Sequence, residues 1–115
     1  MATQFEDILI WQKAKALTLD LYRLFAKSKD FGFRDQIQRA SVSIMNNVAE
    51  GYERKGNKEF YHFLSIAKGS AGEVRSMLSL ARDLGYIQER QYQDLTNRSL
   101  ELSRMIAGLM KKLHE

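Results

Sequence analysis

Apolar residues recur at alternating intervals of three and four along almost the whole chain, in four separate segments. This spacing puts the apolar side chains on one face of an α-helix, and over several turns it is typical of helices that pack side by side. The chain has no proline, so no residue enforces a kink within these segments. We find no strict apolar–polar alternation of the kind that predicts a half-buried strand.

The four segments predict helices over approximately residues 7–28, 34–54, 58–84 and 89–113. The inward faces are expected to contain Ile10, Ala14, Leu17, Leu21 and Leu24, then Ile37, Ala40, Ser41, Ile44, Val48 and Ala49, then Phe60, Phe63, Ala67, Ser70, Val74, Met77, Ala81 and Leu84, and finally Tyr92, Leu95, Ser99, Leu102, Ile106, Leu109 and Leu113. Leu64, Ala71 and Leu78 are expected to widen the third of these faces. Short connections make consecutive helices antiparallel. We therefore expect an all-α, up-down-up-down four-helix bundle in which residues 1–115 form a single domain.

Glycines mark the expected helix ends, with two exceptions. Asp30 and Gly32 are expected to separate the first two helices, and Gly56 and Gly85 suit the left-handed backbone that often follows a helix. Gly69 and Gly72 instead fall inside the third segment, where each costs about 1 kcal/mol relative to alanine. The apolar spacing continues through them, so we expect one unbroken helix whose small residues let another helix approach closely.

Composition excludes several classes of function. The absence of cysteine removes disulfides, thiolate nucleophiles and cysteine-containing zinc sites. The first residues lack the basic and apolar regions of a signal peptide, and no segment is apolar over the ~20 residues that span a bilayer. We expect a cytoplasmic protein with no membrane association. The net charge of +4 is compatible with a nucleic-acid partner but does not by itself require one.

A metal-dependent enzyme is the first catalytic possibility for a four-helix bundle. Di-iron sites of this kind need two Glu-x-x-His motifs on different helices. The chain contains one, from Glu59 to His62, and its other histidine, His114, has Lys111 at the corresponding position. No Gly-x-Ser-x-Gly motif or phosphate-binding loop is present either. We therefore expect no catalytic residues, no metal and no cofactor.

A polar stripe accompanies the apolar face of the second helix. Its members recur at intervals of three and four and are Gln36, Arg39, Ser43, Asn47, Glu50 and Arg54. The stripe is either a solvated face or a set of hydrogen bonds to another helix or subunit. Serine and asparagine are mediocre helix formers, which favours the second alternative. We assign Arg39, Ser43, Asn47 and Glu50, together with Gly69 and Gly72, to helix or subunit contacts.

Basic residues form two further lines at heptad spacing. One line, on the third helix, contains Lys68, Arg75 and Arg82, and the other, on the fourth, contains Arg90, Arg104 and Lys111. Either line could simply face solvent, but if the two converge they form a surface that follows a phosphate backbone. The predicted nucleic-acid contacts are Arg54, Lys55, Lys58, Lys68, Arg75, Arg82, Arg104 and Lys111. No base-recognition motif accompanies them, so we expect weak sequence specificity.

Several blocks of the chain resemble a known family. They are residues 5–14 (FEDILIWQKA), 36–44 (QIQRASVSI), 47–51 (NVAEG), 59–60, 63–64, 66–70 (IAKGS), Glu73 and 84–86 (LGY). In combination they resemble the four-helix-bundle proteins encoded in intervening sequences of bacterial 23S rRNA genes. Accessory proteins of diversity-generating retroelements are more distantly similar. The chain departs from the family pattern in lacking a proline before the second helix and in having Gln38-Arg39 at the position of an Arg-Arg pair.

The resemblance implies a ring-like homopentamer without enzymatic activity that binds RNA or DNA through basic surface. In the retroelement relatives it also implies a reverse transcriptase as a protein partner. We therefore expect a homo-oligomeric protein that binds structured nucleic acid, most simply RNA. The alternative is an interaction adaptor that contacts only proteins.

Overall fold

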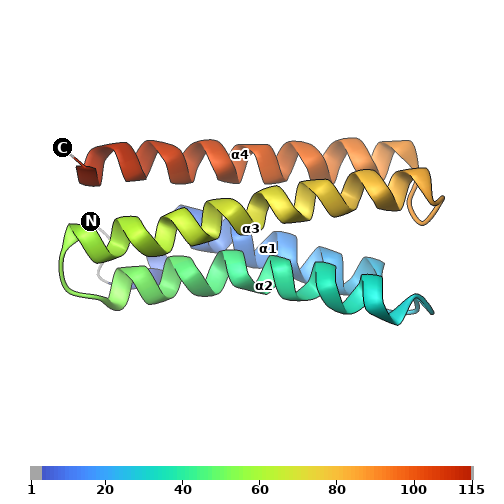
Figure 1. The fold of residues 1–115 in the computed structure, drawn as a ribbon, viewed down its shortest axis with the longest axis horizontal. Helices are drawn as coiled ribbons and strands as arrows, with labels where there is room; N and C mark the ends of the chain where they lie inside the picture. Colours follow the sequence, from blue (N-terminus) through green and yellow to red (C-terminus); the bar gives the residue numbers. More distant parts are fainter. Residues whose placement is uncertain (1–3, 115) are drawn as a thin grey trace.

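The protein is a bundle of four antiparallel α-helices, seen in a computed structural model that describes residues 4–114. A short 3₁₀-helix, η1 (Phe5–Asp7), precedes α1 (Leu9–Leu24), α2 (Phe31–Glu53), α3 (Asn57–Asp83) and α4 (Glu89–His114). Successive helices run in opposite directions along the long axis (Figure 1). The predicted all-α, up-down-up-down architecture is therefore confirmed.

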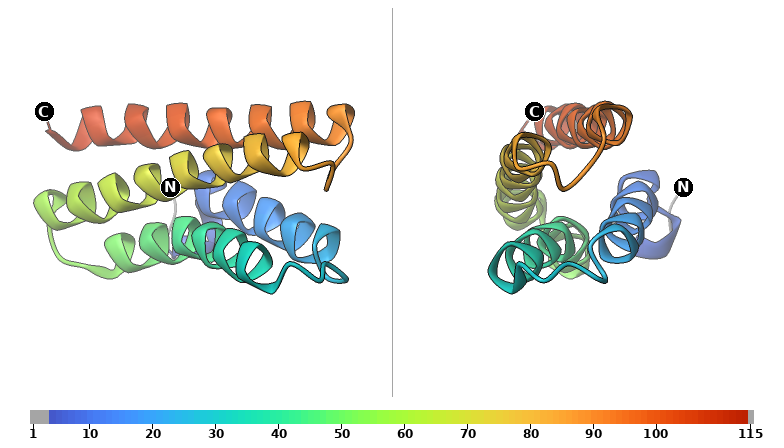
Figure 2. Two further views of the ribbon diagram at one scale, coloured as in Figure 1. Left: turned by 45° about the vertical axis from the view of Figure 1, so that its right-hand side comes forward. Right: turned by 90° about the vertical axis from the view of Figure 1, so that its right-hand side faces the viewer.

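The helices occupy the four corners of the bundle when viewed along its axis (Figure 2, right). Each helix packs against its neighbours in the chain, whereas the Cα atoms of the diagonal pairs α1–α3 and α2–α4 stay more than 8 Å apart over the described residues. The seam between α1 and α4 is the least extensive. Two ion pairs close it, Lys13–Glu101 at 3.1 Å and Arg98–Asp20 at 2.8 Å.

The core follows the predicted apolar faces, and on α3 its centre is rotated from the predicted stripe toward the three residues expected to widen it. The central residues of α3 are Leu64, Ala71 and Leu78, which are fully buried, whereas Phe60 and Phe63 lie at its edge and Leu84 is exposed. The rotation arises because α3 packs on both α2 and α4 and so buries a wide face. The buried Thr18 hydroxyl is satisfied by backbone carbonyls, with bonds from Oγ1 to Ala14 O and Ser41 O at 2.8 and 3.1 Å.

The connection between α1 and α2 differs from the predicted one. Helix α1 covers 9–24 rather than 7–28, because the chain leaves the helix at Phe25, whose side chain is buried in the core. Helix α2 covers 31–53 rather than 34–54, because the Asp30 carboxylate accepts a hydrogen bond from Phe33 N–H at 3.1 Å and caps the helix. Gly32 consequently lies in the first helical turn and does not break the helix. The bounds of α3 and α4 agree with the predicted ones to within one residue.

Asp30 also joins the two connections at one end of the bundle. The Tyr86 hydroxyl, just after α3, donates a 2.6 Å hydrogen bond to Asp30 Oδ2. This bond, followed by the bond from the Phe33 N–H, lowers the pKa of the Asp30 carboxyl below its ordinary value. The Phe33 ring packs between Phe25 and Tyr86, with centroid distances of 5.3 and 5.4 Å.

The lowered pKa predicts how this end of the bundle responds to acid. A carboxyl whose pKa is lower in the folded chain contributes stability above its unfolded pKa of ~3.9, and that stability is lost as the pH falls through the folded value. We expect Asp30→Asn, which keeps a capping oxygen, to melt below the parent chain at pH 7 and to approach it at progressively lower pH below 4. Thermal melting followed by circular dichroism at several pH values tests this. A difference that does not change with pH would contradict it, and Tyr86→Phe should show the same trend.

Glycine has different roles at the other helix ends. Gly56 and Gly85 both have positive φ, 94° and 77°, as expected. Gly85 follows α3, and the Tyr86 N–H bonds back to Ala81 O at 2.8 Å, which ends the helix with a left-handed turn. Gly56 instead immediately precedes α3, whose first helical residue is Asn57.

The close approach expected at Gly69 and Gly72 occurs elsewhere. Helix α3 is unbroken through both residues, as predicted. A Cβ added at Gly69 would have no neighbour within 4 Å, and at Gly72 it would meet only the Arg75 guanidinium at 3.9 Å. Within the chain, therefore, neither glycine is at a helix contact. The tight contact is at Gly51 of α2, where a Cβ would lie 2.8 Å from Phe63 Cβ of α3.

Candidate nucleic-acid interface

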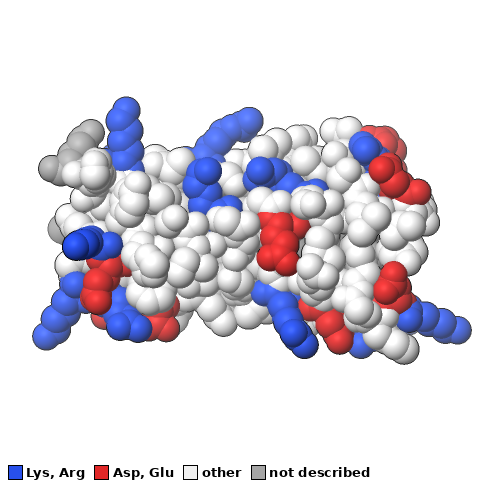
Figure 3. All heavy atoms as spheres, viewed as in Figure 1, with Lys and Arg blue, Asp and Glu red and all other residues white. Residues whose placement is uncertain are grey.

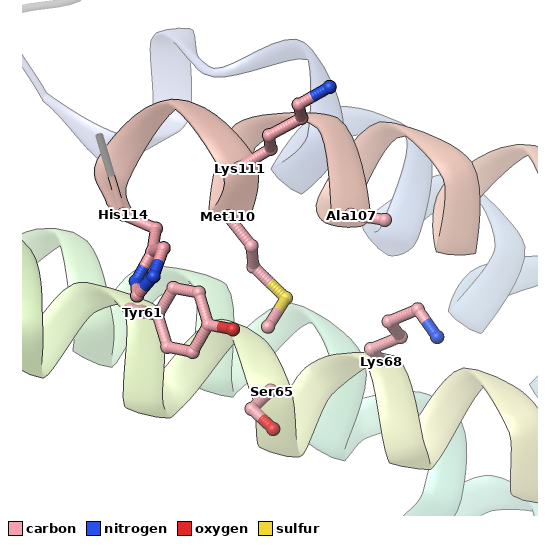
Figure 4. Close-up of a pocket in the computed structure, with 7 residues that line it drawn as sticks. All are labelled: Tyr61, Ser65, Lys68, Ala107, Met110, Lys111 and His114. Atoms are coloured by element: carbon pink, nitrogen blue, oxygen red, sulfur yellow. The ribbon is translucent and has the colours of Figure 1, made fainter.

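Helices α3 and α4 form an open groove along one edge of the molecule. The groove has a volume of about 470 Å³ and is lined by Tyr61, Ser65, Lys68, Ala107, Met110, Lys111 and His114 (Figure 4). Because the two helices are antiparallel, the first half of α3 lies beside the second half of α4. We call this surface the α3–α4 groove.

The residues that line the groove include no Asp or Glu. Residues 60–72 of α3 and 102–114 of α4 are both free of Asp and Glu, and between them they carry Lys68, Arg104, Lys111 and Lys112. Glu59 and Glu73 flank the first segment and Glu101 precedes the second, whereas Glu115 lies outside the described residues. Figure 3 shows Lys and Arg atoms along the upper part of this face, over α3 and α4, and acidic atoms at the centre of the view and toward its right-hand end. The local potential is therefore positive although the net charge of the chain is small.

Three of the predicted cations are available to a ligand. Lys68, Arg104 and Lys111 are exposed and form no ion pair or side-chain hydrogen bond within residues 4–114. An unpaired Lys or Arg releases counterions when it contacts a phosphate and loses no internal partner in doing so. Of these three, Lys68 and Lys111 line the groove together, and Arg104 is exposed seven residues before Lys111 on α4.

Two other predicted cations on this face are held by protein groups. Arg75 Nη1 donates to Ser103 Oγ at 3.0 Å, which links α3 to α4. Arg82 lies 4.1 Å above the Tyr92 ring and bonds to Asp83 at 3.3 Å, so that its pKa is raised further, mainly by the Asp83 hydrogen bond. Both side chains contribute positive charge, but their contacts give them a role in joining the helices.

The remaining predicted cations lie around the turn between α2 and α3. Arg54 pairs with Glu50 at 3.1 Å and covers the Phe63 ring, 5.0 Å from its centroid. Lys55 and Lys58 are exposed. Lys58 also lines a second hollow, with Tyr61 and His114, at the end of the α3–α4 groove. Lys58 therefore extends the basic surface, whereas Arg54 belongs to the packing of the turn.

The polar stripe of α2 forms hydrogen bonds to α3, which was the favoured alternative. Ser43 Oγ lies 2.7 Å from Ser70 Oγ, and Gln36 Nε2 donates to Glu73 at 3.3 Å. Asn47 supports the first contact by donating to Ser43 O and Oγ at 2.8 and 3.0 Å. Glu50 bonds within its own helix to Arg54, and Arg39 is exposed.

Neither residue of the single Glu-x-x-His motif lines the groove. Glu59 and His62 are both exposed on α3, and the His62 ring contacts only Phe63, at 5.4 Å. Over residues 4–114, no three His, Asp or Glu side chains come close enough together to hold a metal ion. The same part of the chain contains no helix that is both long and apolar enough to cross a membrane.

Tyr61 and His114 also belong to this surface, although the sequence patterns above did not select them. The signal that identifies them is the absence of acidic residues from 60–72 and 102–114, which is readable in the sequence. This absence indicates a basic surface only when the antiparallel pairing of α3 and α4 places the two segments side by side. Heptad spacing alone selects cations on a helix face without regard to the acidic residues beside them.

The fold and the groove define a class of protein, an all-α four-helix bundle with one basic face. A family model described as 23S rRNA-intervening sequence protein matches residues 6–108. The chain therefore belongs to the 23S rRNA-intervening sequence protein family, and the resemblance found in the sequence is confirmed.

A solved structure has the same fold. It is the crystal structure of a protein of unknown function from the S23 ribosomal protein family of Bacteroides thetaiotaomicron, with a TM-score of 0.84 and 25% sequence identity. The alignment covers 90% of this chain and 99% of that one. A comparison with curated proteins found no match.

Proposed function

We propose that this protein has no enzymatic activity and binds the phosphate backbone of structured RNA in the α3–α4 groove. The observation that carries the proposal is a groove lined by Lys68 and Lys111 and by no acidic side chain, with Arg104 exposed on the same helix as Lys111. None of these three cations has an internal partner among the described residues. Contacts of this kind to phosphate position a nucleic acid without selecting its sequence. Membership of a family named for intervening sequences of 23S rRNA is consistent with an RNA partner.

The salt dependence of binding tests the proposal. We expect an RNA hairpin to bind with an affinity that falls steeply as salt rises, because each phosphate contact contributes ~0.7–0.9 to the slope of log K against log salt. The triple variant Lys68→Gln, Arg104→Gln, Lys111→Gln should lower that slope by about two to three and weaken binding at low salt. Fluorescence anisotropy titrations at several salt concentrations measure both quantities.

A control variant with the same change in charge keeps the test specific. Arg23→Gln, Lys27→Gln, Lys29→Gln removes three exposed cations from α1 and the turn that follows it, away from the groove. We expect this variant to bind the hairpin almost as the parent chain does. Equal losses in the two triple variants would show that only net charge matters, and binding without a salt slope would overturn the proposal.

We also propose that the protein is a homo-oligomer, and exposed apolar residues on the outer side of α3 support this. Ile66 and Leu80 are 40% and 49% exposed, and Gly69 between them has free space around it, so a neighbouring helix can approach closely. Family resemblance gives five as the expected number of copies. Light scattering should therefore return about five times the 13.3 kDa chain mass, and Ile66→Glu should lower it. A parent chain that remains at 13.3 kDa at micromolar concentration contradicts the proposal.

The same apolar residues favour a second candidate function, an adaptor that contacts a different protein and no nucleic acid. Affinity capture from cell extract with and without nuclease separates the two functions. A protein partner that is retained after nuclease treatment, from a chain that shows no salt-dependent RNA binding, would support the adaptor. Loss of the captured material on nuclease treatment would support the RNA-binding function.

A further inference from the structure

We infer that the α3–α4 groove contains a site for one unpaired nucleotide, whose base stacks on the Tyr61 ring while its phosphates meet the surrounding lysines. This inference rests on the proposed function and specifies which part of an RNA enters the groove. Its basis is the combination of an exposed aromatic ring, an apolar floor and cations within one hollow. Basic surface alone does not explain the ring or the floor.

Tyr61 offers a stacking surface that the fold does not use. The side chain is 37% exposed although it is large and apolar, and its hydroxyl forms no hydrogen bond within the described residues. The His114 ring lies beside it at 5.8 Å between centroids, tilted by 40°. In Figure 4 the Tyr61 ring presents a face outward, and the Met110 side chain reaches toward its hydroxyl. A base can therefore cover the ring without displacing another side chain.

The groove offers an apolar surface for the base of a nucleotide and cations for its phosphates. Ala107 and Met110 form an apolar floor between the helices, which suits the flat surface of a base. Lys68 of α3 and Lys111 of α4 line the same hollow as Tyr61, and Lys58 lines the adjoining one, so both helices supply cations near the ring. The volume of about 470 Å³ lies in the range of small-ligand pockets, ~300–1,000 Å³. The Ser65 hydroxyl, in the same hollow, has no hydrogen-bond partner among the described residues and can bind the nucleotide.

A base in a duplex cannot reach this surface, because its faces are stacked on those of its neighbours. Proteins that bind single strands combine a basic track with aromatic stacking, and the stacking is worth ~1–3 kcal/mol per base. That energy corresponds to a change in affinity of about 5- to 150-fold. The groove therefore predicts a preference for loops, bulges and single strands over uninterrupted helix.

Three RNA probes test the inference: a 12-nucleotide single strand, a strand of the same length that is abasic at every position, and a hairpin closed by a minimal loop. We expect Tyr61→Leu to lose about 5- to 150-fold in affinity for the intact strand and little for the hairpin stem, with an unchanged salt slope. Tyr61→Phe, which keeps the ring, should bind as the parent chain does. Tyr22→Leu is the matched control, because Tyr22 is 41% exposed but lies on α1.

The outcomes separate this inference from the proposed function. Salt-dependent binding that Tyr61→Leu leaves unchanged for all three probes overturns the nucleotide site and leaves the basic groove standing. Loss of affinity with Tyr61→Leu that is equal for strand and hairpin also overturns it, since stacking should distinguish them. Failure of the parent chain to bind any probe at low salt overturns both proposals. A loss confined to the intact strand, absent from the abasic strand, supports the site.

Discussion

Replacing Leu64 with alanine is expected to lower the free energy of unfolding by about 2–5 kcal/mol, more than any other single truncation considered for this chain. Leu64 is fully buried in the centre of the inward face of α3, so its removal leaves a cavity between helices. Small single domains are stable by only ~5–15 kcal/mol, so the variant should lose a large part of its stability. Urea unfolding followed by the fluorescence of Trp11 measures the change.

Leu19→Ala is the matched control for this truncation. Leu19 is the same residue type within a helix, but it is 43% exposed on α1, and a substitution there should cost less than ~0.5 kcal/mol. The comparison tests how α3 is rotated about its own axis. The rotation that buries Leu64 also places Lys68 in the groove beside α4, so the groove depends on it. Similar costs at the two positions would contradict this rotation of α3.

The periodicity of apolar residues was enough to predict the architecture. Four stripes and three short connections leave few alternatives to an antiparallel bundle, and the bounds of α3 and α4 could be placed to within one residue. The predicted helix bounds were wrong at the ends of α1 and α2, where local capping and side-chain burial determine which residue ends the helix. In the sequence, an aspartate that caps a helix cannot be distinguished from one that interrupts it. Only the hydrogen bond that the Asp30 carboxylate accepts from Phe33 N–H identifies Asp30 as the cap.

The candidate site was predictable in its parts but not in its arrangement. Heptad spacing selected Lys68, Arg104 and Lys111 correctly as exposed cations of α3 and α4. Spacing could not show that Arg82 stacks on Tyr92, because the contact depends on which turns of the two helices lie side by side. The same dependence on pairing explains why no sequence pattern singles out Tyr61. Its significance comes from Met110 and His114, which follow it by about fifty residues.

Close contact between α2 and α3 leads to the second large expected effect, at Gly51. An alanine Cβ there would lie 2.8 Å from Phe63 Cβ and 2.9 Å from Phe60 Cδ1. The Phe60 ring can rotate away, but Phe63 Cβ is attached directly to the backbone of α3, so the two helices must separate. The contact also underlies the turn between them, where Arg54 covers the Phe63 ring and Tyr52 meets Phe60 at 6.1 Å.

Gly51→Ala should therefore destabilise the protein by about 1–3 kcal/mol, although alanine favours a helix over glycine by up to ~1 kcal/mol. Gly108→Ala is the matched control, because Gly108 lies inside α4 with no described atom within 4 Å of an added Cβ. That variant should gain about 0.5–1 kcal/mol, so the same substitution has opposite signs at two helical positions. Urea midpoints of both variants against the parent chain test this. A Gly51→Ala variant as stable as Gly108→Ala would contradict the contact between α2 and α3 at Gly51. The start of α3, where Lys58 lies, would then not be positioned by this contact.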